Sequence, residues 1–182
     1  MGGPDTPPAV PAPAPIIDPR RFPLDRVLLD QERIGRHNLQ RYEFAQLTAA
    51  LHWDGPGNLL VCHRRVRADE FWVRGHIPGR PLFPGVLQIE TMAQAAGLHS
   101  ALACEDPPGT FVAFVGVEHV RFREQVAPPA DLWVAGRMLR GGKNVSVVVW
   151  EGQLLRGNGG VVAEGRILGV RMLDGDKRLS KD

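Results

Sequence analysis

The pattern of apolar and polar positions predicts one long helix in the middle of the chain. Residues 86–103 are apolar on nearly every side and carry a single charge, that of Glu90. A helix that is apolar all round is buried, because no face of it suits water. Gly97 and several alanines leave room for close packing against a sheet. We therefore expect this helix to form the centre of the domain.

The other apolar runs predict strands. Before the helix, residues 58–67 and 70–75 form two such runs, and the two-residue link at 68–69 indicates that they pair as a hairpin. Residues 24–51 are mixed in pattern and only weakly helical. After the helix come four strand-like runs, at residues 110–122, 132–139, 145–155 and 161–172.

Two strands, one helix and four strands define the expected fold class. Residues 157–160 (G-N-G-G) are typical of a hairpin turn, so consecutive strands are expected to pair in antiparallel order. The apolar helix has to bury its surface against that sheet. We predict an α+β fold in which an antiparallel sheet wraps around one long central helix.

The two ends of the chain lie outside the predicted domain. Residues 1–23 hold eight of the sixteen prolines, and proline lacks an N–H group and fixes φ, which excludes a helix or a central strand. We expect these residues to form a disordered leader, partly in polyproline II conformation. Residues 24–173 would form one domain, followed by a polar tail at residues 174–182.

Composition narrows the possible functions. A hydrophobic share of 43% supports a real core, and a net charge of +2 gives no electrostatic reason to expect nucleic acid. No run of about eighteen apolar residues and no signal-peptide pattern is present, so we expect no membrane segment and a cytoplasmic protein. Cys62 and Cys104 lack metal-type spacing, and we interpret them as reduced core thiols.

Candidate chemistry begins at His76, which opens a loop rich in proline and glycine. Pro78, Gly79 and Pro81 follow it, and such a loop holds one shape at low entropic cost. Pro84 then stands where the first turn of a helix tolerates proline. A lone histidine is more often structural than catalytic, but a rigid loop that leads into a helix favours a catalytic base.

Glu90 is the second candidate, because it is an ionisable group on a helix expected to be buried. Burying an unpaired carboxylate is costly, and burial should raise its pKa so that it can donate a proton near neutral pH. The alternative is a glutamate that reaches solvent or a buried arginine. Unpaired N–H groups around Gly85 and Val86 would polarise a carbonyl. Together these groups suit removal of a proton next to a carbonyl and loss of a β-hydroxyl.

These residues resemble a known family. The run G-H-I-P-G-R-P-L-F-P-G-V-L-Q-I-E-T-M-A-Q at residues 75–94 resembles the active-site segment of the hot-dog-fold 3-hydroxyacyl-acyl-carrier-protein dehydratases of the FabZ/FabA type. Three shorter stretches resemble the same family, at residues 41–44, 116–123 and 162–165. The resemblance extends over roughly residues 40–172 and implies a hot-dog fold.

The resemblance implies a role for each candidate residue. His76 falls on the catalytic base that takes the C2 proton, and Glu90 falls on the acid that assists departure of the C3 hydroxyl. Gly85, with Val86 beside it, falls on the glycine whose backbone N–H binds the thioester carbonyl. Gln94 falls on the glutamine that steadies the acid. The reaction implied is dehydration of a (3R)-hydroxyacyl-acyl-carrier-protein to the trans-2-enoyl form, without a cofactor or a metal.

The resemblance also implies partners. In this family the histidine and the acid of one site come from different subunits, so we expect a homodimer, or a hexamer built as a trimer of dimers. The acyl chain would lie in a tunnel at the subunit interface. Acyl carrier protein is acidic and would deliver the substrate. Its surface could meet a group of arginines for which ordinary surface pairing is the alternative: Arg74, Arg80, Arg121 and Arg123.

Two other functions stay open beside a dehydratase of fatty-acid or related lipid biosynthesis. One is a hot-dog acyl thioesterase, which needs a carboxylate and a water but not this spacing of histidine, loop and glutamate. The other is a non-catalytic acyl-binding hot-dog protein, against which the presence of both His76 and Glu90 argues.

Overall fold

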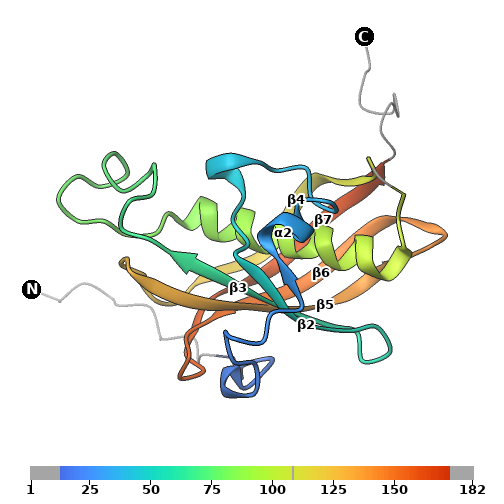
Figure 1. Ribbon diagram of the computed structural model, residues 1–182, viewed down its shortest axis with the longest axis horizontal. Coiled ribbons are helices and arrows are strands. Elements are labelled where there is room, and N and C mark those ends of the chain that lie inside the picture. The colour runs from blue at the N-terminus through green and yellow to red at the C-terminus, as the bar shows by residue number, and fades with distance from the viewer. Residues whose placement is uncertain (1–12, 108, 173–182) are drawn as a thin grey trace, which may run out of the picture.

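The computed structural model describes residues 13–172 apart from residue 108. Within these residues, helix α2 (Gly85–Cys104) lies against one face of a seven-stranded antiparallel sheet (Figure 1). The strands are β1 (Leu29–Asp30), β2 (Ala49–Asp54), β3 (Leu59–Val66), β4 (Phe111–Phe122), β5 (Ala130–Gly142), β6 (Val145–Leu155) and β7 (Val161–Met172). They pair in the order β1-β2-β3-β5-β6-β7-β4. This arrangement confirms the predicted α+β class.

Three short helical segments precede the central helix. They are η1 (Pro19–Arg21), α1 (Gln31–Ile34) and η2 (Tyr42–Phe44). None of the helices that the structure describes has the length and hydropathy that a membrane crossing requires.

Helix α2 lies where the sequence predicts it. It begins directly after Pro84, whose φ of −58° suits the first turn, and it ends where Glu105 adopts a left-handed φ of 53°. Met92 and Leu98 are fully buried between the helix and the sheet. The expected helix over residues 86–103 is therefore confirmed to within one residue at each end.

Trp150 on β6 fixes how α2 sits on the sheet. Its indole ring lies next to Gly136 and Gly152, which face each other on β5 and β6. A Cβ atom would come within 2.2 Å of the ring at Gly136 and within 2.1 Å at Gly152, so only glycine leaves space for the indole. The Trp150 Nε1–H donates to Nδ1 of His99 on α2 at 3.1 Å. This contact fixes the rotation of the helix, and with it the direction in which Glu90 points.

The prediction of a hairpin ahead of the helix is wrong for its second strand, at residues 70–75. β3 pairs with β2 and β5, and β2 begins at the end of the stretch, residues 24–51, that we expected to be weakly helical. Residues 71–75 form turns, and residues 70–75 contain no strand. The Glu70 carboxylate accepts the backbone N–H of Arg67 at 2.7 Å, and a side chain that binds its own local backbone in this way competes with strand pairing.

The segment ahead of β1 lies on the outer face of the sheet, opposite α2 (Figure 1). The expectation of a disordered leader does not hold for residues 13–23. Ile17 is 7% exposed and packs in an apolar cluster with Leu51 on β2, and the Ile16 N–H donates to Oε1 of Gln153 at 2.8 Å. Apolar side chains between the prolines find an apolar surface, and stiff proline backbone has less entropy to lose on docking.

The remaining parts of the leader and the predicted tail are not among the described residues. Residues 1–12 and the polar tail at 174–182 both lie outside the range that the structure describes.

Candidate active site

His76 lies on the loop that links β3 to α2. Its backbone N–H donates to the carbonyl of Trp72 at 2.8 Å, and its ring Nδ1 lies 2.9 Å from the carbonyl oxygen of Leu82. A carbonyl oxygen only accepts, so the neutral ring carries its proton on Nδ1 and donates it to Leu82. Nε2 then keeps its lone pair on an exposed side chain. His76 therefore has the tautomer and the accessibility of a general base.

Glu90 lies on the second turn of α2, one turn before Gln94. The Gln94 Nε2 group donates to Oε1 of Glu90 at 2.7 Å and to the carbonyl of Phe44 at 2.7 Å. The Gln94 Oε1 atom accepts the backbone N–H of Gln46 at 2.8 Å. That N–H group can only donate, so it determines which end of the Gln94 amide faces Glu90. Gln94 thereby links the acid to the segment that enters β2.

Burial controls the proton affinity of Glu90. Removal of the carboxyl group from water raises its pKa above the usual 4.5, and the hydrogen bond from Gln94 opposes this shift in part, because that bond favours the carboxylate. The result is a carboxyl group that holds its proton at higher pH than an exposed glutamate. This is the property that a general acid needs.

The N-terminus of α2 lies between these two groups in the sequence. The first residues of a helix have no intrahelical acceptor for their N–H groups, so those of Gly85 and Val86 point out of the helix start. The Val86 side chain is 72% exposed. A Cβ atom at Gly85 would lie 2.9 Å from the Phe122 ring on β4. A larger residue at this position would therefore have to displace the Phe122 ring.

The interactions within one chain do not join the base to the acid. Among the described residues, the ring of His76 bonds to Leu82 and the carboxylate of Glu90 bonds to Gln94, with no hydrogen bond between the two. The two candidate groups therefore have separate hydrogen-bond partners within the chain. In the part of the chain that the structure describes, no group of three or more His, Cys, Asp or Glu side chains is placed to hold a metal.

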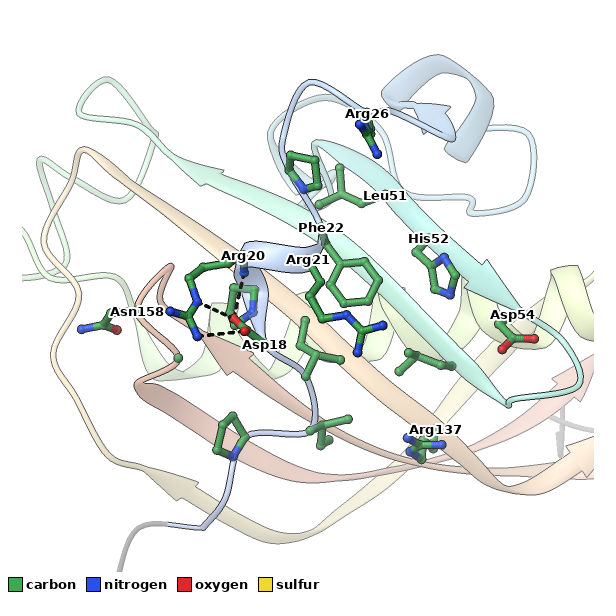
Figure 2. Close-up of a pocket in the computed structure, with 17 residues that line it drawn as sticks. Asp18, Arg20, Arg21, Phe22, Arg26, Leu51, His52, Asp54, Arg137 and Asn158 are labelled. Carbon is green, nitrogen blue, oxygen red and sulfur yellow. Dashed lines mark hydrogen bonds and ion pairs between the residues drawn. The ribbon is translucent and has the colours of Figure 1, made fainter.

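A large cavity among the described residues lies away from His76 and Glu90. It has a volume of about 930 Å³ and lies on the outer face of the sheet, between the segment at residues 15–26 and strand β2 (Figure 2). Phe22 and His52 form part of its lining, with ring centroids 5.2 Å apart, and Arg20 is paired with Asp18 at its edge. None of the predicted site residues contributes to it. Pocket size alone therefore does not identify the candidate site. The site is identified by the chemistry of residues 76–94.

A smaller cavity of about 560 Å³ lies beside the His76 loop. Its lining includes Tyr42, Arg64, Glu70 and Phe71. Tyr42 and Phe71 are 89% and 54% exposed, so two aromatic side chains are open to solvent at this cavity.

The fold and the site together define the class of protein. An antiparallel sheet around one buried helix, with a histidine loop leading into that helix and a glutamate on its second turn, is typical of a hot-dog protein of the dehydratase type. The chain belongs to the family described as the FabA-like domain, whose model matches residues 38–166.

Individual relatives agree with this family. Over 146 residues, the chain is 31% identical to 3-hydroxyacyl-[acyl-carrier-protein] dehydratases FabZ from Shewanella sp. strain MR-4 and from Shewanella oneidensis. Each match covers 79% of this chain and 92% of the relative. The chain is therefore a homologue of FabZ dehydratases over nearly their whole length.

Solved structures support the fold. The dehydratase heterocomplex ApeI:P from Xenorhabdus doucetiae matches with a TM-score of 0.64 and 18% identity, covering 79% of this chain and 93% of that one. A mutant thioesterase from Pseudomonas aeruginosa matches with a TM-score of 0.59 and 16% identity, covering 81% and 96%. Because both identities are low, these matches show the hot-dog fold and do not separate the two activities.

Sequence reasoning missed two supports of the site. The backbone of Phe44 and Gln46, which orients Gln94, falls next to the stretch at residues 41–44 that resembles the family, so a signal was present there. The ion pair between Arg64 and Glu70, below the His76 loop, had no signal, because the two residues belong to separate predicted strands and no sequence motif links them.

Proposed function

We propose that the chain is a 3-hydroxyacyl-acyl-carrier-protein dehydratase of fatty-acid or related lipid biosynthesis. The observation that carries the proposal is the support given to Glu90, a partly buried carboxyl group of raised pKa held by Gln94. It occurs in the same short segment as an exposed imidazole whose Nε2 is free to accept a proton. Homology to FabZ dehydratases supports the same activity.

In the proposed reaction, Nε2 of His76 removes a proton from C2 of the substrate thioester. The N–H groups of Gly85 and Val86 stabilise the negative charge that develops on the thioester oxygen. Glu90 gives its proton to the C3 hydroxyl, which leaves as water. The C2–H and C3–O bonds break, the C2=C3 double bond forms, and proton exchange with solvent restores both side chains. Gln94 holds the Glu90 carboxyl in place throughout.

We propose that the site is completed across a homodimer. Strand β4 lies at one end of the sheet and exposes a run of apolar side chains, with Phe114, Val115 and Val117 exposed by 57%, 63% and 40%. A long apolar edge strand is a site of association unless another strand covers it. Pairing of β4 with its copy would cover this edge and bring the Glu90 of one protomer towards the His76 loop of its partner.

Acyl carrier protein is the proposed source of the substrate. Of the four arginines expected to meet its acidic surface, Arg74, Arg80 and Arg121 have exposed side chains. Arg123 pairs with Glu164 and is largely buried, so it is a poor docking residue. The first three are the arginines that we propose for carrier docking.

The test is turnover of hydroxyacyl thioesters. Purified protein is incubated with 3-hydroxyacyl thioesters of acyl carrier protein and of coenzyme A, and the products are identified by mass. We expect loss of water and formation of the trans-2-enoyl thioester, and we expect His76→Ala and Glu90→Gln to abolish it. His52→Ala, on the outer face of the sheet, is the control and should remain active.

Three outcomes would contradict the proposal. Release of free thiol without an alkene would identify a thioesterase. An acyl thioester that binds and is recovered unchanged would identify a non-catalytic acyl-binding protein. Full turnover by His76→Ala would remove the proposed base.

A further inference from the structure

A buried ion pair lies beneath the loop that carries His76. The Arg64 side chain on β3 is 7% exposed and the Glu70 side chain is 10% exposed, and Nη2 of Arg64 donates to Oε2 of Glu70. Other arginine–glutamate pairs among the described residues are more exposed, from 17% and 20% for Arg123 and Glu164 to 69% and 83% for Arg36 and Glu32. The Arg64–Glu70 pair beneath the loop is therefore more deeply buried than these pairs.

The Glu70 carboxylate collects donors from both ends of a turn. In addition to Arg64, its Oε2 atom accepts the indole N–H of Trp72 at 2.8 Å, and its Oε1 atom accepts the backbone N–H of Arg67 at 2.7 Å. Hydrogen bonds to a charged acceptor are stronger than hydrogen bonds between neutral groups. One carboxylate thus fixes the end of β3, the first turn of the loop and the indole ring of Trp72.

Trp72 connects the Glu70 hydrogen bonds to His76, the candidate base. Its carbonyl accepts the backbone N–H of His76 at 2.8 Å and that of Gly75 at 3.2 Å. The residue that donates its side-chain N–H to Glu70 therefore also holds the main chain of the candidate base. A shift of Trp72 would move the His76 ring relative to the carbonyl of Leu82, which determines its tautomer.

The same group supports the start of α2. The ring of Phe83 lies 5.7 Å from that of Trp72, and the guanidinium of Arg64 stacks on it at 5.1 Å from its centroid. Phe83 is 3% exposed, and its N–H donates to the carbonyl of Val126 at 2.7 Å. Only Pro84 separates it from Gly85. One cluster therefore supports both the base and the N–H donors at the helix start.

Stability alone does not explain a buried pair at this position. Two charges removed from water are often no better than well-packed apolar side chains, and within the described residues the Nε atom of Arg64 is buried without a hydrogen-bond partner. The geometric effect of the pair is the stronger reason for its presence. We propose that Arg64 and Glu70 are positioning residues, which act through Trp72 and Phe83 to hold His76 and Gly85 in register. This inference rests on the proposed function for its kinetic part.

The test compares two variants with a matched control. Glu70→Gln removes the charge and turns an amide N–H towards donors, and Trp72→Phe keeps an aromatic ring but removes the indole N–H. Glu164→Gln breaks another Arg–Glu pair, that with Arg123, whose side chains are 17% and 20% exposed. We expect kcat to fall on the order of 100-fold in Glu70→Gln, since misplacement by about 1 Å has such an effect, with KM changed less than about threefold. The control should keep its kcat.

A second readout does not depend on activity. The nitrogen NMR shifts of the His76 ring report which nitrogen carries the proton. We expect the Nδ1–H tautomer in the wild type and in Glu164→Gln, and a mixture with the Nε2–H tautomer in both loop variants. If the wild type lacks dehydratase activity but the tautomer shifts as expected, the proposed function fails and the positioning role stands.

Either loop variant alone can overturn the inference. A folded Glu70→Gln protein with an unchanged His76 tautomer and a kcat within about twofold of the control would contradict it. If Glu70→Gln fails to fold, Trp72→Phe decides, because it keeps an aromatic ring next to Phe83 and loses the hydrogen bond to Glu70.

Discussion

Gln94→Leu is the most informative single substitution for the candidate site. Gln94 is 3% exposed, and its amide bonds to the backbone N–H of Gln46, the carbonyl of Phe44 and the carboxylate of Glu90. Leucine has a similar size and cannot form any of these bonds. The substitution therefore removes three hydrogen bonds from one place without creating a large cavity.

The expected loss of stability follows from the groups that are left unpaired. The buried N–H of Gln46 would lose its acceptor at a cost of about 1–3 kcal/mol, and the half-buried carbonyl of Phe44 would add about 1 kcal/mol. The greater apolar surface of leucine returns about 1 kcal/mol. We expect the free energy of unfolding to fall by about 2 kcal/mol.

The pKa of Glu90 should also change in Gln94→Leu. The hydrogen bond from Gln94 lowers the pKa of Glu90 against the effect of burial, so its loss should raise that pKa further. Urea unfolding measures the first effect, and carbon NMR titration of the Glu90 carboxyl measures the second. A loss below about 0.5 kcal/mol together with an unchanged pKa would refute the reasoning.

Gln88→Leu is the matched control for this experiment. Gln88 is also 3% exposed on α2, but its side chain makes one hydrogen bond, from Nε2 to the carbonyl of Phe83 at 3.1 Å. Its Oε1 atom is buried without a partner in the part of the chain that the structure describes. We expect a smaller loss of stability and no change in the pKa of Glu90.

Three further predictions concern α2. Because burial raises the pKa of Glu90, the folded state binds the proton more tightly than the unfolded state. The unfolding free energy of Glu90→Gln minus that of the wild type should therefore grow as pH rises from the usual pKa of glutamate to the raised pKa of Glu90. The expected growth is about 1.4 kcal/mol for each pH unit between these two pKa values. A difference that stays constant across pH would contradict this. His99 has its pKa lowered to about 4 from 6.5, so the wild type should lose roughly 3 kcal/mol as pH falls between these values, and a ring titrating near 6.5 by NMR would be inconsistent. Gly85→Ala places Cβ 2.9 Å from the Phe122 ring and should cost about 1 kcal/mol, which Phe122→Ala in the same chain should restore.

Most of the sheet and the central helix could be predicted from local pattern. β6 and β7 have the predicted bounds, residues 145–155 and 161–172, because β-branched residues and a glycine-rich turn define them locally. β5 extends beyond the predicted residues 132–139 to Ala130–Gly142, since pairing with β3 and β6 overrides the weak preference of its ends.

The elements before the helix could not be predicted in this way. β2 contains Ala49 and Ala50, which favour helices, and it is a strand because it pairs with β3 and buries Ala50 in the core. Residues 70–75 contain strand-like Phe71 and Trp72, but the hydrogen bonds of Glu70 close a turn there. In both places a contact distant in sequence, or a side chain bound to backbone, decides the outcome.

The candidate site shows the same division. His76, Gly85 and Glu90 lie within fifteen residues of one another, so a motif could identify them together. Their supports come from other segments: Gln46 orients Gln94, and Arg64 fixes Glu70. The leader differs for a similar reason, because its composition indicates disorder while Ile16 and Ile17 meet an apolar surface that the sequence does not reveal.

The central claim is that one site takes His76 from one protomer and Glu90 from its partner. Mixing unfolded His76→Ala and Glu90→Gln proteins and refolding them together tests this directly. In a two-fold symmetric dimer, half of the refolded dimers would be mixed, and each would contain one intact site, so we predict recovery of about a quarter of wild-type dehydratase activity. Activity no higher than that of the two variants refolded separately would contradict the account.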